Sequence, residues 1–248
     1  MSVVAVIQAR MGSSRLPGKV LAEIEGRAML EHVVERVLAC SAIHRVVVAT
    51  TELPEDDELA ARARALGVDV YRGSAHDVLD RYRGAAAAAG ARVIVRVTAD
   101  CPLLDPAVIG AVVGALDDGV DYASNTHVRT FPRGLDVEAF HADTLTRIAR
   151  LATSAAAREH VTSFVLERPA LFATRDVVAA RDDSDLRLTV DTPGDLALVR
   201  AVARRFGAAS TPYTAVVGFL RAHPDVRALN ADVVQTSWRD AEVGHARA

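Results

Sequence analysis

Short runs of apolar, largely β-branched residues recur along the first half of the chain. Longer stretches with helical spacing separate them. Each run is short and uninterrupted, as in strands buried on both faces of a parallel sheet. Strands are predicted at residues 3–7, 45–50, 68–71 and 92–98, and helices over residues 28–39 and from 54 to about 67. This alternation predicts an α/β fold, with a parallel sheet and right-handed helical crossovers.

The middle of the chain is less regular. Residues 108–116 have helical spacing, and residues 121–126 begin an irregular region. Pro132 and Gly134 predict a turn before a short strand. An apolar helix is predicted to open with residues 158–164.

Residues 186–190 are predicted to form a strand, because Leu186, Leu188 and Val190 alternate with polar residues. A helix start follows at residues 192–195, with the order of an N-cap, a first-turn proline and an acidic third position. From residue 211 onward the chain is predicted to be helical, with breaks at Gly218 and Pro224. Residues 235–248 lose periodicity, as a mobile tail does.

Composition narrows the class of protein. The length of 248 residues, half of them hydrophobic, predicts one large domain or one domain with a small appendage. The formal net charge of -3 gives no indication of a nucleic-acid binder. The apolar runs are too short for a membrane span or a signal-peptide core. Cys40 and Cys101 have neither zinc spacing nor C-x-x-C spacing, so we expect a reducing, cytoplasmic location.

The most informative segment is the loop that follows the first predicted strand, at residues 8–19. Its distinctive residues are two glycines, two serines and three cations: Gly12, Gly18, Ser13, Ser14, Arg10, Arg15 and Lys19. Glycines let a backbone approach a ligand closely, and consecutive N–H groups can form an anion-binding nest. Arginine adds a forked donor for phosphate oxygens, and lysine adds a point charge. The loop therefore predicts a polyphosphate site at a strand's carboxyl end, where α/β sheets bind ligands.

Two common phosphate motifs do not fit this loop. Walker A needs four residues between its glycines and a Ser or Thr after the lysine. Here five residues separate Gly12 from Gly18, and Val20 follows Lys19. The loop also lacks the dinucleotide pattern G-x-G-x-x-G. The alternative interpretation is a basic surface loop on an α/β domain.

Two aspartates stand at predicted strand ends without a structural explanation. Asp105 is explained as a helix N-cap, and Thr192 and Asp195 are explained by the next helix start. Asp100 and Asp191 are left over, and carboxylates in such positions can hold a hard cation. For Asp100, a turn-stabilising role is the alternative on spacing alone.

Three further segments place polar residues at turns or helix starts. Ser74 and Asp77 have the spacing of a capping box, with Ser74 as the N-cap. Arg133 is a suitable partner for a substrate carboxylate, with a solvated turn as the alternative. His160 could shuttle a proton, and a histidine at a helix start or an interface is the alternative.

Six motifs resemble those of the cytidylyltransferases that activate acidic sugars, above all the spore-coat polysaccharide SpsF-like branch, a relative of the CMP-KDO and CMP-sialic acid synthetases. In chain order they are I-Q-A-R-M-G-S-S-R-L-P-G-K-V-L (7–21), Y-R-G-S-A-H-D-V-L-D-R-Y (71–82), R-V-T-A-D-C-P-L (96–103), F-P-R-G-L-D-V-E (131–138), R-E-H-V-T (158–162) and V-D-T-P-G-D-L (190–196). Ala99 replaces a glycine that is common in the family. The resemblance covers most of the chain.

The resemblance implies a Rossmann-like, three-layer nucleotidyltransferase fold of the GT-A-like kind, with a mostly parallel central sheet. It implies a single domain over residues 1–237, with a small insertion at about 125–180 for acceptor binding and dimerisation, and a flexible tail at 238–248. A homodimer and a Mg²⁺ cofactor are further expectations.

The resemblance also assigns roles to individual residues. Arg15, Lys19, Asp100 and Asp191 are expected to be catalytic, with the two aspartates as magnesium ligands joined by the fold in front of Lys19. The residues expected to bind the nucleotide are Ala9, Arg10, Met11, Gly12, Ser13, Arg15, Lys19, Arg72, Ser74, Thr98 and Asp100. The residues expected to face the acceptor are Arg133, Asp136, Glu138 and His160.

The implied reaction transfers CMP from CTP to a sugar acid, nonulosonic or related, and releases pyrophosphate. Positioning of the reactants and electrostatic stabilisation would account for the rate acceleration, as in phosphoryl transfer generally. Three alternatives stay open: a glycosyltransferase that consumes a nucleotide sugar, a phosphonate or other non-sugar acceptor, and a nucleotide-binding scaffold with a degenerate site. No D-x-D stretch follows an early strand, which argues against the first. The presence of Lys19, Asp100 and Asp191 together argues against the last.

Overall fold

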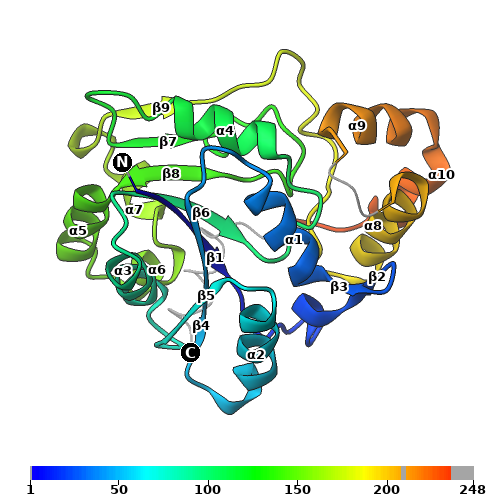
Figure 1. The fold of residues 1–248 in the computed structure, drawn as a ribbon. Coiled ribbons are helices and arrows are strands. Elements are labelled where there is room, and N and C mark those ends of the chain that lie inside the picture. The colour runs from blue at the N-terminus through cyan, green and yellow to red at the C-terminus, as the bar shows by residue number, and fades with distance from the viewer. Residues whose placement is uncertain (1, 208–210, 236–248) are drawn as a thin grey trace, which may run out of the picture.

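The computed structural model of the chain describes residues 2–207 and 211–235. A seven-stranded sheet runs through its centre in the order β5-β4-β1-β6-β8-β7-β9 (Figure 1). The strands are β1 (Val3–Gln8), β4 (Arg45–Thr51), β5 (Asp69–Gly73), β6 (Val93–Thr98), β7 (Tyr122–Ser124), β8 (Glu138–His141) and β9 (Thr174–Asp176). β1, β4, β5 and β6 are parallel, whereas β8 is antiparallel to both β6 and β7.

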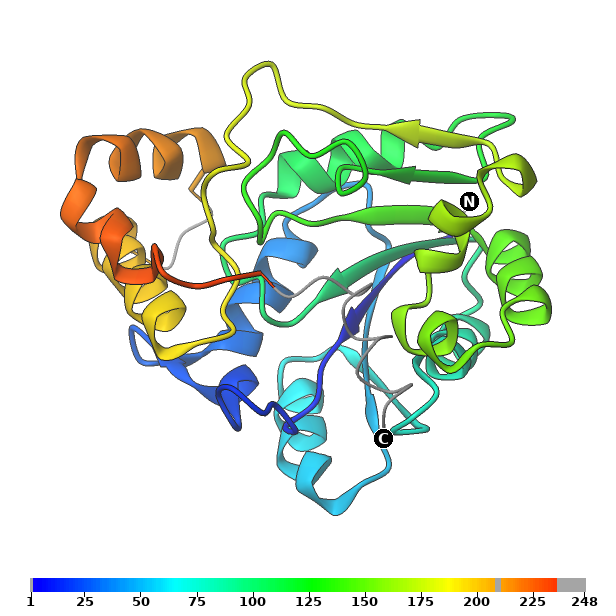
Figure 2. The same cartoon turned by 180° about the vertical axis from the view of Figure 1, so that it is seen from behind.

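Helices cover both faces of this sheet, so the fold has three layers (Figures 1 and 2). One face carries α3 (Val78–Ala88), α5 (Ala142–Leu151), α6 (Ala155–His160) and α7 (Ser163–Glu167). The other face carries α1 (Met29–Leu38), α2 (Asp57–Ala65) and α4 (Pro106–Gly114), and α8 (Pro193–Phe206) and α9 (Tyr213–Ala222) extend the same apolar core beyond α1. The smaller elements are α10 (Pro224–Arg227), a hairpin of β2 (Glu23–Ile24) and β3 (Arg27–Ala28), and the 3-10 turns η1 (Lys19–Leu21), η2 (Pro54–Asp56), η3 (Pro169–Leu171) and η4 (Ala228–Asn230).

The first strand shows how the apolar pattern produces these layers. Val4 and Val6 point to the face of α3, while Ala5 and Ile7 point to the face of α1. All four side chains are fully buried. Successive side chains of a strand point to opposite faces, so a strand covered on both faces must be apolar throughout. The predicted parallel α/β sheet is therefore confirmed.

Two predicted helix starts are confirmed by their hydrogen bonds. Asp105 caps α4, because its carboxylate accepts from the backbone N–H of Ala107 at 2.8 Å. Thr192 and Asp195 form a reciprocal capping box at the start of α8. These two caps explain Asp105 and Thr192 without a ligand.

The predicted capping box at Ser74 is wrong. The N-cap of α3 is Asp77, whose carboxylate accepts from the backbone N–H of Asp80 at 2.9 Å. Ser74 instead accepts from the backbone N–H of Asp77 at 3.0 Å and closes the preceding turn. The helix starts later than expected because the chain makes this turn before it enters α3.

Three other predicted elements differ from the structure. Residues 186–190 form no named strand and make only an isolated bridge between Arg133 and Arg187, although Leu186, Leu188 and Val190 are buried as the alternation predicted. Gly218 does not break α9, because the buried Val216, Val217 and Leu220 hold the helix against the core.

The predicted helix from residue 158 is also interrupted. Val161 has a φ of 54°, in the left-handed region, so α6 ends at His160 and α7 begins at Ser163. The interruption brings His160 and Ser163 to the same cavity wall.

β8 and β9 fall within residues 125–180 and yet belong to the central sheet. The separation of an insertion from a single domain over residues 1–237 stays a prediction. The tail predicted at 238–248 lies outside the described residues. Within residues 2–207 and 211–235, no helix has the length and apolar character needed to cross a bilayer.

Candidate active site

The loop after β1 is fixed at both of its ends. Asp56 is fully buried, and one of its carboxylate oxygens accepts from the backbone N–H of Met11 at 2.7 Å. Its other oxygen accepts from the backbone N–H of Thr51 at 3.1 Å. At the far end, Gly18 has a φ of 68° and donates its N–H to the carbonyl of Met11 at 3.1 Å. The loop is therefore tied down by Asp56, a residue at the start of the helix predicted from residue 54.

Within the tied loop, a run of backbone donors stays available. In the described part of the chain, the N–H groups of residues 12–16 donate to no other group. Arg10 beside them is exposed and forms no ion pair with any described residue. Consecutive amides with nearby cations form an anion-binding surface. This geometry agrees with the polyphosphate role predicted for the loop.

Lys19 lies between the two unexplained aspartates. Its Nζ is 2.9 Å from Asp100 Oδ2 and 2.8 Å from Asp191 Oδ1, and it also donates to the carbonyl of Val190 at 2.8 Å. Burial alone would lower the pKa of Lys19, but the charges and hydrogen bonds of Asp100 and Asp191 raise it. The expectation that the fold joins the two aspartates in front of Lys19 is confirmed.

Each aspartate has further partners. The Thr98 hydroxyl donates to Asp100 Oδ1 at 2.6 Å. Arg15 lies 3.2 Å from Asp191 Oδ1, and Arg187 donates to Asp191 Oδ2 at 2.5 Å. Burial would raise the pKa of Asp191, but Lys19, Arg15 and Arg187 lower it. Asp191 is therefore ionised at neutral pH.

A pocket of about 280 Å³ opens over these residues. It is lined by Gln8, Ala9, Arg10, Gly12, Ser13, Ser14, Arg15, Lys19, Val20, Thr98, Ala99, Asp100 and Asp191. Of the residues expected to bind the nucleotide, Met11, Arg72 and Ser74 are not in this lining. Sequence reasoning missed Gln8, although it is a polar residue at the end of a buried strand. Its side-chain oxygen is buried and has no partner among the described residues.

Arg72 lies at the end of β5, where it holds loops together. It donates to the carbonyls of Thr51 at 2.8 Å and Leu53 at 2.9 Å, and it pairs with Asp57 at 2.6 Å. The nucleotide-binding roles of Arg72 and Ser74 stay predictions.

A larger cavity of about 710 Å³ adjoins the pocket and shares Arg15, Thr98, Asp100 and Asp191 with it. The four residues expected to face the acceptor, Arg133, Asp136, Glu138 and His160, all line this cavity. The rest of its lining includes Arg96, Arg129, Thr126, Thr162, Ser163 and Leu166. The two aspartates therefore stand at the junction of the two spaces.

Most charges in this cavity are already paired. Arg129 forms a bidentate ion pair with Asp136, with N–O distances of 2.7 and 3.0 Å. The carboxylate of Glu138 bonds to Arg96, to the Tyr122 hydroxyl and to the Thr162 hydroxyl. Burial would raise the pKa of Glu138, but Arg96 and these hydroxyls lower it.

Arg133 is the exception. Among the described residues, its guanidinium has no ion-pair or hydrogen-bond partner. Burial and the neighbouring Arg129 and Arg187 lower the pKa of Arg133. Its position is fixed by Gly134, with a φ of 99°, where a Cβ would lie 2.4 Å from the backbone nitrogen of Thr189. Arg133 is thus an unneutralised cation held in the cavity wall.

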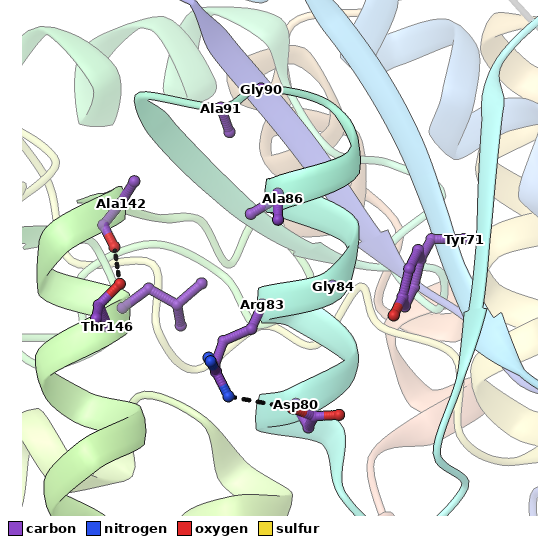
Figure 3. A pocket seen from close by; sticks show the side chains of 11 residues that line it. Tyr71, Asp80, Arg83, Gly84, Ala86, Gly90, Ala91, Ala142 and Thr146 are labelled. Carbon is purple, nitrogen blue, oxygen red and sulfur yellow. Dashed lines mark hydrogen bonds and ion pairs between the residues drawn. The ribbon is translucent and has the colours of Figure 1, made fainter.

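A separate hollow between α3 and α5 has a different character (Figure 3). Its lining is largely alanine and glycine, and its charged residues Asp80 and Arg83 pair with each other at 3.2 Å. Tyr71 packs on α3 at Gly84, where a Cβ would lie 1.9 Å from its hydroxyl oxygen. This hollow has no concentration of unpaired charge that would suit a phosphate.

A cysteine nucleophile finds little support at the site, and the acidic residues form no complete metal cage by themselves in the described part of the chain. Burial and the adjacent Asp100 carboxylate raise the pKa of the Cys101 thiol well above its ordinary value, which disfavours a thiolate nucleophile. Within residues 2–207 and 211–235, no three His, Cys, Asp or Glu side chains converge as a metal cage.

A parallel α/β sheet, a tethered loop of backbone donors and two aspartates beside a lysine define a nucleotidyltransferase. The comparison with family models then specifies the class, because residues 4–208 match the cytidylyltransferase family. The chain belongs to this family, whose members are CTP-dependent nucleotidyltransferases.

Individual relatives agree with this assignment. The spore coat polysaccharide biosynthesis protein SpsF of Bacillus subtilis is 34% identical over 213 residues, which cover 83% of this chain and 88% of SpsF. The 3-deoxy-manno-octulosonate cytidylyltransferase of Geobacter sulfurreducens is 40% identical over 118 residues, 47% of this chain and 46% of the relative. A solved cytidylyltransferase from Leptospira borgpetersenii superposes with a TM-score of 0.89 at 32% identity, over 96% of this chain and 100% of that one.

Proposed function

We propose that the protein transfers CMP from CTP to a hydroxyl of a sugar acid and releases pyrophosphate, with Mg²⁺ as cofactor. One observation carries this proposal above the others. Asp100 and Asp191 stand between a pocket of free backbone donors and a cavity that holds one unpaired arginine. A triphosphate on one side and an acidic acceptor on the other would meet at this pair.

The loop pocket suits the triphosphate. The N–H groups of residues 12–16 provide hydrogen-bond donors, and Arg10, Arg15 and Lys19 add positive charge at the same place. In the reaction, the acceptor oxygen attacks the α-phosphorus in line, the bond to the bridging oxygen breaks, and the hydroxyl proton is released. Charge then grows on the leaving pyrophosphate, which Arg10, Arg15 and Lys19 are placed to stabilise.

Asp100 and Asp191 would hold the magnesium ion. The ammonium of Lys19, itself a cation, already contacts one oxygen of each carboxylate, so the donors fit a cation at this place. Mg²⁺ is commonly held by one or two carboxylates together with substrate phosphates and water, which agrees with the lack of a third acidic ligand among the described residues. When bound, it would neutralise phosphate charge and polarise the attacking oxygen.

The adjoining cavity suits an acidic sugar. Arg133 is available for a carboxylate, and a planar guanidinium binds carboxylates with two parallel hydrogen bonds. The paired charges of Arg129 and Asp136, and of Arg96 and Glu138, offer polar edges for sugar hydroxyls without adding net charge. The names of the relatives, a spore coat polysaccharide protein and a 3-deoxy-manno-octulosonate enzyme, support a sugar acid. The expected homodimer stays a prediction.

The test is pyrophosphate release with CTP, ATP, GTP or UTP, with and without Mg²⁺, against a panel of nonulosonic and related sugar acids and a phosphonate. We expect release with CTP, Mg²⁺ and one sugar acid. Release with the phosphonate alone would overturn the acceptor class and leave the nucleotide chemistry intact. Tight CTP binding without release from any acceptor would contradict the sugar-acid proposal, and full activity in a chelator would contradict the metal.

A further inference from the structure

Arg187 lies four residues before Asp191, in the segment that was predicted to be a strand. Its side chain is only 9% exposed, and within the described chain it belongs to the lining of neither cavity. Arg187 therefore does not touch a substrate that occupies those spaces. Its effect on the reaction must pass through the residues that it binds.

The partners of Arg187 surround Asp191. Arg187 donates to Asp191 Oδ2 at 2.5 Å and to Asp195 Oδ1 at 2.9 Å. Asp195 in turn accepts from the backbone N–H of Asp191 at 3.0 Å. Asp191 is thus held at its side chain and at its backbone by one closed ring of hydrogen bonds. With Oδ2 engaged in this ring, Oδ1 is the oxygen that reaches Lys19 and Arg15.

The C-terminal segment of residues 229–235 completes the ring. Asn230, 8% exposed, donates to the carbonyl of Arg187 at 3.1 Å and to Asp195 Oδ1 at 2.9 Å. The side-chain oxygen of Gln235 accepts from Arg187. In Figure 2 the last described residues, in red, run from the C-terminal helices back toward the end of β6. This segment lies beyond residues 4–208, the part of the chain that matches the family model.

Close packing keeps the segment in place. A Cβ at Gly194, in the first turn of α8, would lie 2.5 Å from the carbonyl oxygen of Leu229. Only glycine lets the backbone of α8 approach residue 229 so closely. The start of α8 and the C-terminal segment therefore form one packed unit around Arg187.

We propose that Arg187 is a positioning residue that orients Asp191 so that only Oδ1 faces the cation site, and that residues 229–235 lock Arg187 in this orientation. The proposal rests on the proposed function. The planar fork of arginine can bond to Asp191, Asp195 and Gln235 together, which the single ammonium of lysine cannot do in the same geometry. Partners that orient a metal ligand typically change metal affinity or activity by about 10–100-fold when they are removed.

The test compares Arg187→Lys and Asn230→Ala with Arg200→Lys as control. Arg200 is half-buried, lies away from both cavities and, among the described residues, donates only to the carbonyl of Glu23, at 2.9 and 2.7 Å. Mn²⁺ affinity in the presence of CTP is measured by calorimetry, next to kcat, the KM for CTP and the melting temperature. For Arg187→Lys we expect about 10-fold weaker Mn²⁺ binding and a lower kcat, with the KM for CTP within about twofold. Asn230→Ala should also weaken Mn²⁺ binding and lower kcat, by smaller factors. The control Arg200→Lys should match the wild type.

A crystal structure of Arg187→Lys without metal gives a readout that does not depend on the proposed function. The proposal expects the Asp191 carboxylate to rotate away from its wild-type orientation. An unchanged Asp191, or a folded variant with wild-type Mn²⁺ affinity, would overturn it. A variant that only melts earlier, with unchanged affinity and orientation, would also overturn it, because that is the signature of a purely structural arginine. If wild-type protein bound no Mn²⁺, the metal proposal would fail, and the orientation of Asp191 would still decide the role of Arg187.

Discussion

The two spaces that meet at Asp100 and Asp191 are built in opposite ways. The loop pocket comes mainly from one contiguous segment, and its backbone donors in residues 12–16 have no partner among the residues that the structure describes. The larger cavity draws on β6, on the segment before β8, and on α6 and α7. Its charges are mostly neutralised within the protein, by the pairs Arg96–Glu138 and Arg129–Asp136.

This difference reflects what each space would bind. A triphosphate brings several negative charges, so a pocket of uncommitted donors gains most from it. A sugar acid brings one negative charge and many hydroxyl groups. For that ligand, a single free cation among internally satisfied pairs avoids leaving other buried charges without partners. The four variants below test this contrast, from the largest expected effect to the smallest.

Asp100→Asn should have the largest effect, because Asp100 serves both spaces. We expect turnover to fall about 10³-fold, roughly 4 kcal/mol of transition-state stabilisation, while the protein stays folded. Pyrophosphate release and the melting temperature are the measurements. Asp185→Asn, at a surface carboxylate paired with Arg221 and Arg227, is the control. Wild-type turnover in Asp100→Asn would show that the reaction does not require the Asp100 carboxylate.

Lys19→Met should weaken both the use of CTP and the link that Lys19 makes between Asp100 and Asp191. We expect kcat/KM for CTP to fall about 10²-fold, roughly 3 kcal/mol. Asp100 and Asp191 would also lose the cation that they share, and only Asp191 would keep other cationic partners, Arg15 and Arg187, so the melting temperature should fall. CTP titration calorimetry and thermal unfolding measure the two effects separately. A loss of acceptor binding with normal CTP binding would contradict the role of Lys19 toward CTP.

Arg133→Gln should affect the acceptor side alone. We expect the KM for the acceptor to rise about 30-fold, roughly 2 kcal/mol for a lost charged hydrogen-bonded contact, with the KM for CTP within about twofold. Arg175→Gln, at an exposed arginine paired with Asp117, is the matched control. An equal rise in both KM values would show that the two spaces are not separable in the way that the pairing suggests.

Glu138→Gln should have the smallest effect and should depend on pH. The folded pKa of Glu138 lies below its ordinary 4.5, so its ionised form stabilises the fold at neutral pH, and this contribution is lost as pH falls below about 4.5. We expect the variant to lose about 1.5 kcal/mol of unfolding free energy at pH 7 and less at pH 3, because the contribution fades as pH falls through the folded pKa. Urea unfolding at both pH values is the measurement. A pH-independent difference would mean that packing, not charge, explains the change.

Several features of the site were predictable because they depend on residues close together in the chain. The loop of residues 8–19 shows its chemistry in its composition, and the caps at Asp105 and Thr192 follow from local spacing. Those caps left Asp100 and Asp191 as unexplained carboxylates at the ends of two segments. Local hydrogen bonds have a sequence signature, because the groups that form them are a fixed few residues apart.

Other local predictions failed where tertiary contacts outweighed local preference. Gly218 stays inside α9 because three apolar neighbours pack into the core. Residues 186–190 keep their alternating burial without pairing as a strand, because their backbone hydrogen bonds go to scattered partners: Leu186 and Leu188 bond to Arg133, and Val190 bonds to Asp100. In both places, packing decided between conformations of similar local energy.

By itself, the sequence determined the parallel α/β layers, the donor-rich loop after the first strand and the two candidate carboxylates, since each depends on apolar period or on neighbouring residues. Only the tertiary structure decided which charged side chains bond to which distant groups. Lys19 bonds to aspartates 81 and 172 residues away, and Asp56 holds a backbone N–H that lies 45 residues before it. Such pairs have no characteristic spacing, because the distance between them is set by how the strands are ordered in the sheet and not by the chain between them.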